Sequence, residues 1–139
     1  MNAVITPQTN TDWIEALPDP GLLVDPVRDT VEAANSHLAR MLGRSVDDLL
    51  AVRVTTLFGG QIPQLVSLTD EAMTHGEAWS RDLTLVARDE RVIELELSLS
   101  VVTENGEPRV LMLLRDLALL RDRRERHEIN SYHRGGLLH

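Results

Sequence analysis

Hydrophobic residues alternate most regularly with polar ones in RVIELELSLSVV, residues 91–102. The apolar positions are Ile93, Leu95, Leu97, Leu99 and Val101. Because successive side chains of a strand point to opposite faces of a sheet, the pattern predicts a long strand with one face on the core. Asn105-Gly106 follows and favours a tight hairpin turn, since both residues tolerate positive φ. RVLMLLRD, residues 109–116, is more continuously apolar and predicts a central strand.

Three earlier segments also predict strands, the first as a short apolar run and the other two by their two-residue period. GLLVD (21–25) and TVEAAN (30–35) are joined by a polar turn and predict a first hairpin. WSRDLTLVAR (79–88) predicts a long strand that precedes the two described above. The residues on one side of it are Trp79, Arg81, Leu83, Leu85 and Ala87. We therefore expect two short strands near the start of the chain and three long antiparallel strands near its end.

The middle of the chain has the 3.6-residue period of helices. Asn35 or Ser36 is a suitable N-cap for a helix that ends at Gly43, and Ser45 starts a second short helix. A longer helix ends at Gly76, and its apolar positions are Ile62, Leu65, Leu68, Ala72 and Met73. TNTDWIEALPDP, residues 9–20, predicts one or two helical turns that the two prolines stop.

The last predicted strand leads into a charged segment, RDLALLRDRRERHEIN, residues 115–130. Asp116 is a good N-cap, and its negative charge suits the positive end of a helix. Opposite charges recur four residues apart, as in Arg121 and Glu125, and each exposed pair contributes about 0.2–0.5 kcal/mol. The segment therefore predicts a helix that leaves the sheet, with too few apolar residues for a coiled-coil seam of its own.

The order of these elements, together with three local motifs, resembles the PAS domain. LPDPGLLVD is similar to the family's first strand. EAANSHLARMLGRSVDDLLAVRVTTLF is similar to its asparagine-led helix, its Gly-x-Ser-x-x-x-Leu helix and the turn before its long helix. VLMLLRDLALLRDRRER is similar to its last strand and exit motif, so the resemblance covers about residues 12–126. It implies an α+β fold, with a five-stranded antiparallel sheet, short helices over one face, and N-terminal and C-terminal flanking helices.

The resemblance divides the chain into three parts. We expect a disordered or loosely ordered N-terminus at residues 1–11, a PAS-like sensory domain at 12–117, and a charged exit helix or linker at 118–139 that leads to an output domain outside the chain. One turn departs from the family pattern. ARDERV has Glu90 where the family usually has a glycine, so we expect a turn of a type that L-residues can make.

Composition narrows the function classes. The chain has 139 residues and no cysteine, which excludes disulfides, thiolate metal sites and cysteinyl adducts. Residues 1–114 contain eight arginines and 18 acidic residues, which gives a net charge of −10, so we expect no direct binding to nucleic acid. No window approaches the ~20 apolar residues of a membrane span, and the first residues do not resemble a secretion signal. We therefore expect a cytoplasmic protein.

The PAS resemblance implies a small apolar pocket, whose occupant it does not define. Arg53 and Arg81 are possible anchors for an anionic ligand. The apolar candidates for its lining are Leu42, Val54, Leu65, Leu68, Trp79, Leu95, Leu97 and Leu113. The alternative is that these apolar residues are simply core, and the sequence does not separate the two. No element carries histidines and carboxylates at a metal-ligand spacing, so no metal site is expected.

Two further residue sets are candidates for signalling. Arg115, Asp116 and Leu117 stand where the last strand meets the exit helix, and we expect them to relay a change at the pocket to that helix. Trp13, Ile14 and Leu17 form the apolar side of the N-terminal helical segment. We expect them, with the outer face of the sheet, to pack against a second copy of the chain in a homodimer.

Two histidines raise more specific possibilities. His75 ends the long helix and suggests a haem ligand, because some PAS domains bind haem through a histidine on that helix. His75 lies later in the helix than those ligands, beside Gly76. A favourable interaction of its side chain with the negative end of the helix explains its position equally well. His127 begins HEIN, which resembles the phosphoacceptor box of sensor kinases. The next residues, SYHRGGLL, lack the proline of that box and contain two helix-weakening glycines, so we interpret HEIN as part of the charged helix.

The sequence thus favours a non-catalytic sensory and dimerisation module of a bacterial signal-transduction protein. Its output domain would be a histidine kinase or a transcriptional regulator, and its cofactor, if there is one, is not defined. The alternative is a small α+β enzyme or ligand carrier with an apolar pocket. An enzyme needs histidine and carboxylate groups that converge on a cleft, and the sequence shows no such set. It also lacks a phosphate-binding loop, so ATP cleavage would belong to another domain.

Overall fold

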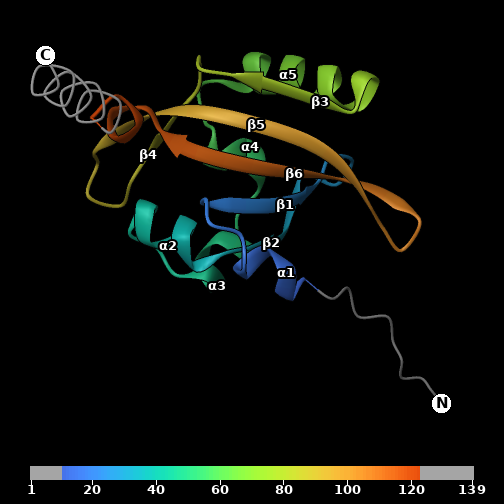
Figure 1. Cartoon of the computed structure of the whole chain (residues 1–139), viewed down its shortest axis with the longest axis horizontal. Coiled ribbons are helices and arrows are strands. Elements are labelled where there is room, and N and C mark those ends of the chain that lie inside the picture. Colours follow the sequence, from blue (N-terminus) through green and yellow to red (C-terminus); the bar gives the residue numbers. More distant parts are fainter. Residues whose placement is uncertain (1–10, 123–139) are drawn as a thin grey trace, which may run out of the picture.

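The predicted pair of strands at the end of the chain forms a long hairpin in the middle of the sheet (Figure 1). The structure is a computed structural model that describes residues 11–122. Strand β5 (Val92–Glu104) pairs with β6 (Glu107–Asp116) from Leu95 opposite Asp116 to Glu104 opposite Glu107. Asn105 and Gly106 connect them with φ of 52° and 79°, as the hairpin prediction required.

The predicted N-terminal hairpin is also present, and it lies beside β6. Strand β1 (Gly21–Asp25) pairs with β2 (Thr30–Ala34) on one side and with β6 on the other, all antiparallel. The order of the five main strands is β2-β1-β6-β5-β3, so β6 is central, as its continuous apolar run predicted. The expected antiparallel α+β architecture is confirmed, with one addition: β4 pairs with β5 outside this order and makes a sixth strand.

The prediction of one long strand over residues 79–88 is wrong. The chain forms two short strands there, β3 (Glu77–Ser80) and β4 (Thr84–Val86). The Ser80 hydroxyl accepts a hydrogen bond from the backbone N–H of Asp82 at 3.0 Å and stabilises a bend between the two strands. The alternation is interrupted at this bend, so Trp79 is 64% exposed whereas Leu83 and Leu85 are each 1% exposed.

The helices predicted for the middle of the chain are present and have the expected caps. They are α2 (Ser36–Leu42), α3 (Val46–Leu50) and α5 (Ile62–His75). Asn35 and Ser45 accept hydrogen bonds from the first turns of α2 and α3, and Gly43 and Gly76 end α2 and α5 in the left-handed conformation. A further short helix, α4 (Val54–Leu57), lies in the segment that the sequence analysis left without an element.

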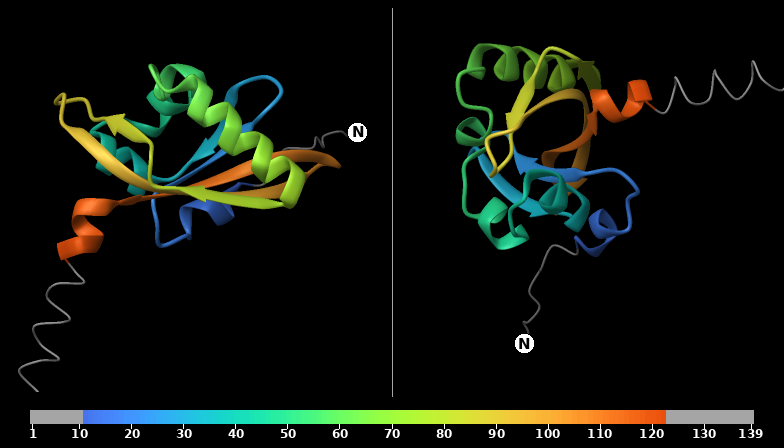
Figure 2. Two further views of the ribbon diagram at one scale, coloured as in Figure 1. Left: turned by 90° about the horizontal axis from the view of Figure 1, so that it is seen from above. Right: turned by 90° about the vertical axis from the view of Figure 1, so that its left-hand side faces the viewer.

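These four helices cover one face of the sheet, called the inner face below, and α1 (Asp12–Glu15) lies on the opposite, outer face (Figure 2, left). Alternate residues of the long strands point inward and form one core with the helices. Fully buried members of this core are Leu22, Leu38, Leu42, Phe58, Leu95, Leu97, Leu99 and Met112. On the outer face, Ile14 of α1 packs with Leu23 and Ala33 in a second, smaller cluster.

The turn between β4 and β5 is made by L-residues, one of them in an uncommon conformation. Glu90 has φ of 69°, so an L-residue occupies the left-handed region where the family usually has glycine. This conformation costs ~1 kcal/mol, because it brings Cβ close to the following carbonyl oxygen. Hydrogen bonds hold the turn on both sides: Ala87 N–H donates to Arg91 O at 2.9 Å, and Glu90 N–H donates to Ala87 O at 2.9 Å.

Candidate functional site

A cavity of about 220 Å³ opens between the β1–β2 turn, α4, α5 and the centre of β6, and we call it the α5 cavity. Its apolar wall includes Val54 and Leu65, two of the predicted pocket residues, and Met112 of β6. Its rim is polar and includes Asp29, Thr55 and Thr69. A pocket with an apolar wall and a few polar groups suits a small, partly apolar molecule.

The rim of the α5 cavity is held by side-chain hydrogen bonds. Asp29 accepts a hydrogen bond from the backbone N–H of Thr55 at 3.0 Å and another from its hydroxyl group. Thr69 donates from its hydroxyl to the carbonyl of Leu65 at 2.8 Å. Asp29 itself has φ of 59°, a conformation that aspartate tolerates better than most residues. The turn residue Asp29 and the first turn of α4 therefore form one rigid edge of the cavity.

The other predicted pocket residues do not line the α5 cavity. Leu42, Leu68, Leu95 and Leu97 are buried in the inner core, with at most 6% of their surface exposed. Arg53 is exposed, and its backbone forms an isolated antiparallel β-bridge with Thr30 just before α4 begins. For these residues the core or surface interpretation describes their position better than the pocket interpretation.

Trp79, Arg81 and Leu113 lie on the other side of the sheet from the α5 cavity. Trp79 pairs with Ser98, and Ser98 pairs with Leu113, so both apolar side chains share the outer face. The guanidinium of Arg81 stands 5.6 Å from the centre of the Trp79 ring and forms an ion pair of 2.9 Å with Glu96. The prediction that Trp79 lines the pocket was wrong because the bend after Ser80 puts Trp79 on the opposite face from Leu83 and Leu85. For Leu113 it was wrong because this residue alternates with the inward-facing Met112 and Leu114 of β6.

The sequence analysis missed Asp29, Thr55, Thr69 and Met112 as cavity residues. Met112 carried a usable signal, since it lies two residues from Leu114 and on the same face of its strand. Asp29 and Thr55 carried none, because their contact joins residues 26 positions apart, from the β1–β2 turn to α4, a helix that was not assigned. Such contacts depend on tertiary structure.

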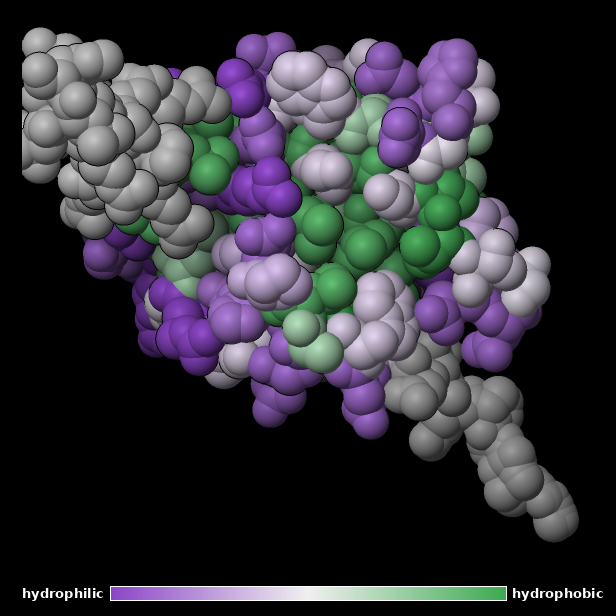
Figure 3. All heavy atoms as spheres, in the orientation of Figure 1, coloured by the Kyte–Doolittle hydropathy of each residue, from purple (hydrophilic) through white to green (hydrophobic). Residues whose placement is uncertain are grey.

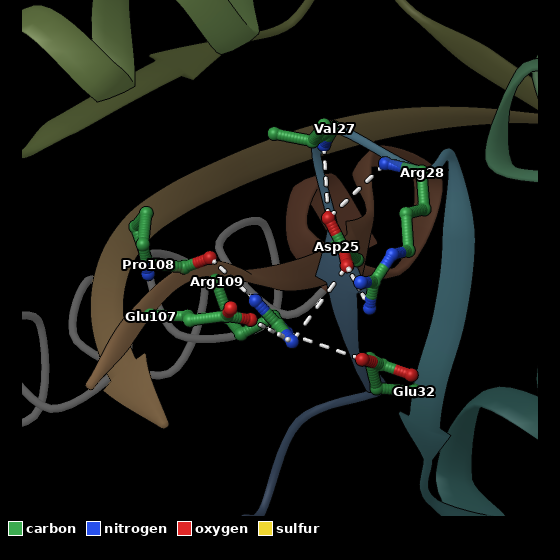
Figure 4. A network of polar contacts seen from close by, with 7 residues as sticks. All are labelled: Asp25, Val27, Arg28, Glu32, Glu107, Pro108 and Arg109. Carbon is green, nitrogen blue, oxygen red and sulfur yellow. Dashed lines mark hydrogen bonds and ion pairs between the residues drawn. The ribbon is translucent and has the colours of Figure 1, made fainter. Parts of the chain in front are cut away.

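A polar network beside the cavity ties the β1–β2 turn to the β5–β6 hairpin (Figure 4). The buried Asp25 carboxylate accepts from the N–H groups of Val27 at 2.9 Å and Arg28 at 3.1 Å, and it faces Arg109 at 3.6 Å. Arg109 also pairs with Glu32 and Glu107, each at 3.1 Å. The network thus crosses from β2 over β1 to β6.

The pKa values of Asp25 and Arg109 in this network shift in opposite directions. Burial by itself would raise the pKa of Asp25, but the N–H groups of Arg28 and Val27 and the nearby Arg109 outweigh it, so the pKa lies below its usual value. Burial would lower the pKa of Arg109, and the carboxylates of Glu107, Asp25 and Glu32 reverse that effect and raise it. Both groups are therefore held in their charged forms at neutral pH.

The predicted relay residues lie where β6 becomes a helix, and residues 117–122 of this exit helix are described. Asp116 caps the helix, since its Oδ1 accepts from the N–H of Ala118 at 2.9 Å. Arg115 pairs with Asp19 at 3.2 Å and with Glu96 at 3.4 Å. Leu117 is 7% exposed and so anchors the first turn of the helix to the domain.

The residues predicted for a dimer surface lie on the outer face. Ile14 is 3% exposed and belongs to the chain's own core, whereas Trp13 and Leu17 are half-buried and pack beside Val102 and Leu111. Glu15 fixes α1 to α2, because it accepts hydrogen bonds from the hydroxyl and the N–H of Ser36, which lower its pKa. Figure 3 views this face, where hydrophobic side chains gather over the middle strands.

The two histidine hypotheses have different outcomes. His75 is exposed at the last residue of α5, and it lines an open surface hollow beside β3 instead of the α5 cavity. His127 lies outside the described residues. Within residues 11–122, no group of three or more histidines and carboxylates is placed to hold a metal ion. In the same part of the chain, no helix is both long enough and apolar enough to span a membrane.

A curled antiparallel sheet with helices over its inner face, and a helix that leaves its central strand, defines a class of α+β domains. Comparison with known families makes the assignment specific. The family model of the PAS domain matches residues 19–118, and the chain belongs to the PAS domain family. PAS domains are signal-sensing modules that are typical of histidine kinases and are generally non-catalytic. The sequence matches no curated protein.

Several solved PAS domains share the fold at low identity. A PAS domain from Desulfitobacterium hafniense superposes with a TM-score of 0.62 at 16% identity, over 76% of this chain and 99% of that one. The PAS domain of nitrogen regulation protein NR(II) from Vibrio parahaemolyticus gives 0.60 at 18% identity, over 74% and 93% of the two chains. A domain of a sensory box sensor histidine kinase/response regulator from Geobacter sulfurreducens gives 0.60 at 19%, over 75% and 88%.

Proposed function

We propose that the chain is a non-catalytic sensory and dimerisation module, which passes a signal through its exit helix to an output domain of a bacterial signalling protein. The observation that carries the proposal is the uninterrupted passage of the central strand into that helix at Asp116 and Leu117. A histidine kinase or a transcriptional regulator suits the output role. The PAS family assignment favours this class over a small enzyme or carrier.

The relay that we propose rests on the contacts of Arg115, Asp116 and Leu117. Arg115 joins the start of the exit helix to the α1–β1 linker through Asp19 and to β5 through Glu96. Arg121, one turn further, faces Glu94 of β5 at 3.3 Å. A change in the curvature of β5 or in the linker would alter these pairs together. The helix would then favour a different position, which is a shift between two populated states.

The signal that we propose is a small molecule in the α5 cavity or a change in its shape. Met112 lies at the wall of the cavity and on β6, four residues before Asp116. An occupant that pushes on Met112 therefore acts on the same strand that carries the exit helix. This short path supports a mechanical relay without a long chain of intermediates.

The partner that we propose is a second copy, packed on the outer face. Trp13 and Leu17 of the α1 region, with Val102 and Leu111 of the sheet, offer a mostly apolar surface around α1. A two-fold axis through this face would place each copy's α1 against the other copy's sheet. Ile14 contributes indirectly, because its burial fixes α1 in position.

Analytical ultracentrifugation of the chain tests the dimer. We expect a dimer at micromolar concentration and at least roughly ten-fold weaker association for Leu17→Glu and Leu111→Glu, because each places a charge in an apolar contact. Val27→Glu is the matched control, since Val27 is 87% exposed in the β1–β2 turn, away from the outer face. A parent chain that sediments as a monomer at these concentrations, or a Val27→Glu variant as weak as the other two, would refute the proposed surface.

A second measurement tests the relay. Asp116→Ala removes the cap of the exit helix and should destabilise its first turn by about 1 kcal/mol. We expect faster amide hydrogen exchange at residues 117–122 and unchanged exchange in α5. Ser45→Ala removes a cap of the same kind from α3 and should leave the exit helix unchanged. Equal exchange in the parent and in Asp116→Ala would show that Asp116 does not hold the helix.

A further inference from the structure

A groove of about 690 Å³ lies at the root of the exit helix. The exit helix leaves the domain at the end that faces the viewer in Figure 2, right. One wall belongs to the body of the domain and consists of α2 and the α1–β1 linker, with Met41 and Pro20 as apolar contacts. The other wall is the exit helix, with Leu119 and Leu120. We call it the root groove. It shares no lining residue with the α5 cavity.

Several of the side chains that line the root groove are arginines. Arg40 of α2, Arg91 of the β4–β5 turn and Arg115 of β6 all line it, together with His37. Two carboxylates also line it, and both are engaged: Asp19 pairs with Arg115 at 3.2 Å, and Asp116 caps the exit helix. The groove therefore holds more positive than negative charge, on a chain whose net charge is −8.

Arg40 and Arg91 supply this excess. Among residues 11–122, Arg40 contacts only the Nδ1 atom of His37, at 2.9 Å, and Arg91 donates only to the carbonyl of Met41, at 3.3 Å. Neither guanidinium forms an ion pair within the described chain, whereas Arg28, Arg81 and Arg109 each face a carboxylate. A second hollow beside the groove is lined by the same two residues and by Arg88 and Asp89. The carboxylate of Glu15, which is hydrogen-bonded to Ser36, attracts Arg40 at longer range. Several donors thus converge with no carboxylate of the described residues within ion-pair distance of the Arg40 or Arg91 guanidinium.

We propose that the root groove binds a small organic dianion, a dicarboxylate or a phosphate compound with an apolar part. The guanidinium groups of Arg40 and Arg91 would each hold an anionic oxygen pair in the bidentate geometry that arginine favours. The apolar part of the ligand would lie on Met41 and Leu119, which is 54% exposed. The bound anion would then connect α2 to the exit helix and hold that helix against the domain.

The root groove can bind an anion whether or not the exit helix relays a signal. Any regulatory effect of that binding rests on the proposed relay function. A ligand that bridges the body and the exit helix favours the helix position in which both walls are in contact. It would act at the root of the helix itself, downstream of any signal from the α5 cavity. The groove would thus be a second input to the same output.

Two-dimensional NMR on the full 139-residue chain tests the proposal, with the arginine Nε–Hε and backbone N–H signals as readouts. The probes are inorganic pyrophosphate, hexanedioate and uncharged hexanediol, at constant ionic strength. We expect saturable shifts of the Arg40 and Arg91 signals and of the Leu119 and Leu120 amides with at least one anion, and none with hexanediol. Saturation by pyrophosphate alone assigns a phosphate ligand, and saturation by hexanedioate alone assigns a dicarboxylate.

Variants separate a built site from general charge attraction. Arg40→Gln and Arg91→Gln should each weaken binding by roughly ten-fold, because each removes a charge-assisted hydrogen-bonding group. Arg53→Gln is the matched control, since Arg53 is also exposed and lines no part of the groove. The proposal is overturned if neither anion saturates the Arg40 and Arg91 signals by about 10 mM, or if Arg53→Gln weakens binding equally. Shifts that leave the Leu119 and Leu120 amides unchanged would refute the bridge to the exit helix. None of these results depends on dimerisation or on the α5 cavity.

Discussion

The side chain of Asn35 should contribute more to stability than any helix cap elsewhere in residues 11–122, and the substitution Asn35→Ala tests this. Asn35 is fully buried, and its Oδ1 accepts from Gly21 N–H at 3.1 Å and Leu38 N–H at 3.0 Å. Its Nδ2 donates to the carbonyls of Ile14 at 3.0 Å and Asp19 at 2.9 Å. One side chain therefore joins α1, the α1–β1 linker, β1 and α2.

The expected cost follows from these four bonds. Each hydrogen bond contributes ~1 kcal/mol net, and alanine removes all four, so Asn35→Ala should cost about 4 kcal/mol. The Ile14 carbonyl keeps a second bond, from Leu17 N–H at 3.3 Å. That is a large part of the 5–15 kcal/mol by which domains are typically stable. Ser45→Ala is the control, because the Ser45 hydroxyl makes one exposed cap bond to Asp48 N–H at 3.0 Å and its loss should cost about 1 kcal/mol.

Urea unfolding followed by circular dichroism measures both variants. The midpoint should fall several times further for Asn35→Ala than for Ser45→Ala, with the same dependence on urea concentration. Asn35→Asp adds a further comparison, since it keeps the two accepted bonds and loses the two donated ones. If Asn35→Ala costs no more than Ser45→Ala, the reasoning is refuted, and α1 and the linker would be held by apolar packing instead.

Three other substitutions test the β4–β5 turn and the charge of Asp25. Glu90→Gly should raise the free energy of unfolding by about 0.5–1 kcal/mol, because glycine adopts the φ of 69° without the Cβ penalty. Asp89→Gly, in the same turn, should lower it, since Asp89 accepts a hydrogen bond from Arg91 N–H, and a gain for both variants would contradict the argument. Asp25→Asn should cost about 1–2 kcal/mol at pH 7, because the carboxylate of Asp25 binds two N–H groups and Arg109. The pKa of Asp25 is lower in the folded protein than in the unfolded chain. The stabilisation by its carboxylate is therefore fully present above the unfolded value of ~3.9 and is lost as the pH falls through the folded pKa. The difference in free energy of unfolding between the parent and Asp25→Asn should accordingly disappear in acid. A gap that stays constant from neutral to acid pH would exclude this role of the charge.

The sequence predicted the fold well wherever one local rule decided the structure. Strict alternation placed β5, the Asn105-Gly106 pair placed its hairpin, and capping residues placed α2 and α3. The sequence was less informative where tertiary contacts decided instead. The bend after Ser80 depends on a single hydroxyl, and Glu90 keeps a left-handed φ because the surrounding hairpin fixes it.

The candidate site was harder to predict than the fold. Apolar residues of the inner core and of a cavity wall have the same pattern along a strand, so Leu95 and Leu97 could not be told from true lining residues. The root groove had no signal at all in the sequence. Arg40, Arg91 and Arg115 are far apart along the chain and come together only because β6 passes the end of α2 on its way into the exit helix.

The position of β6 also has a consequence for how the protein is made. Strand β1 is one of the first elements to be synthesised, yet Leu22 pairs with Met112, 90 residues later. Contacts between such distant residues slow folding, because a long loop must close before they stabilise anything. During synthesis, the hairpin of β1 and β2 must therefore wait for nearly the whole domain before its inner edge is covered. The strand that carries the exit helix is thus the one that completes the sheet, so the helix can dock only on a domain that has finished folding.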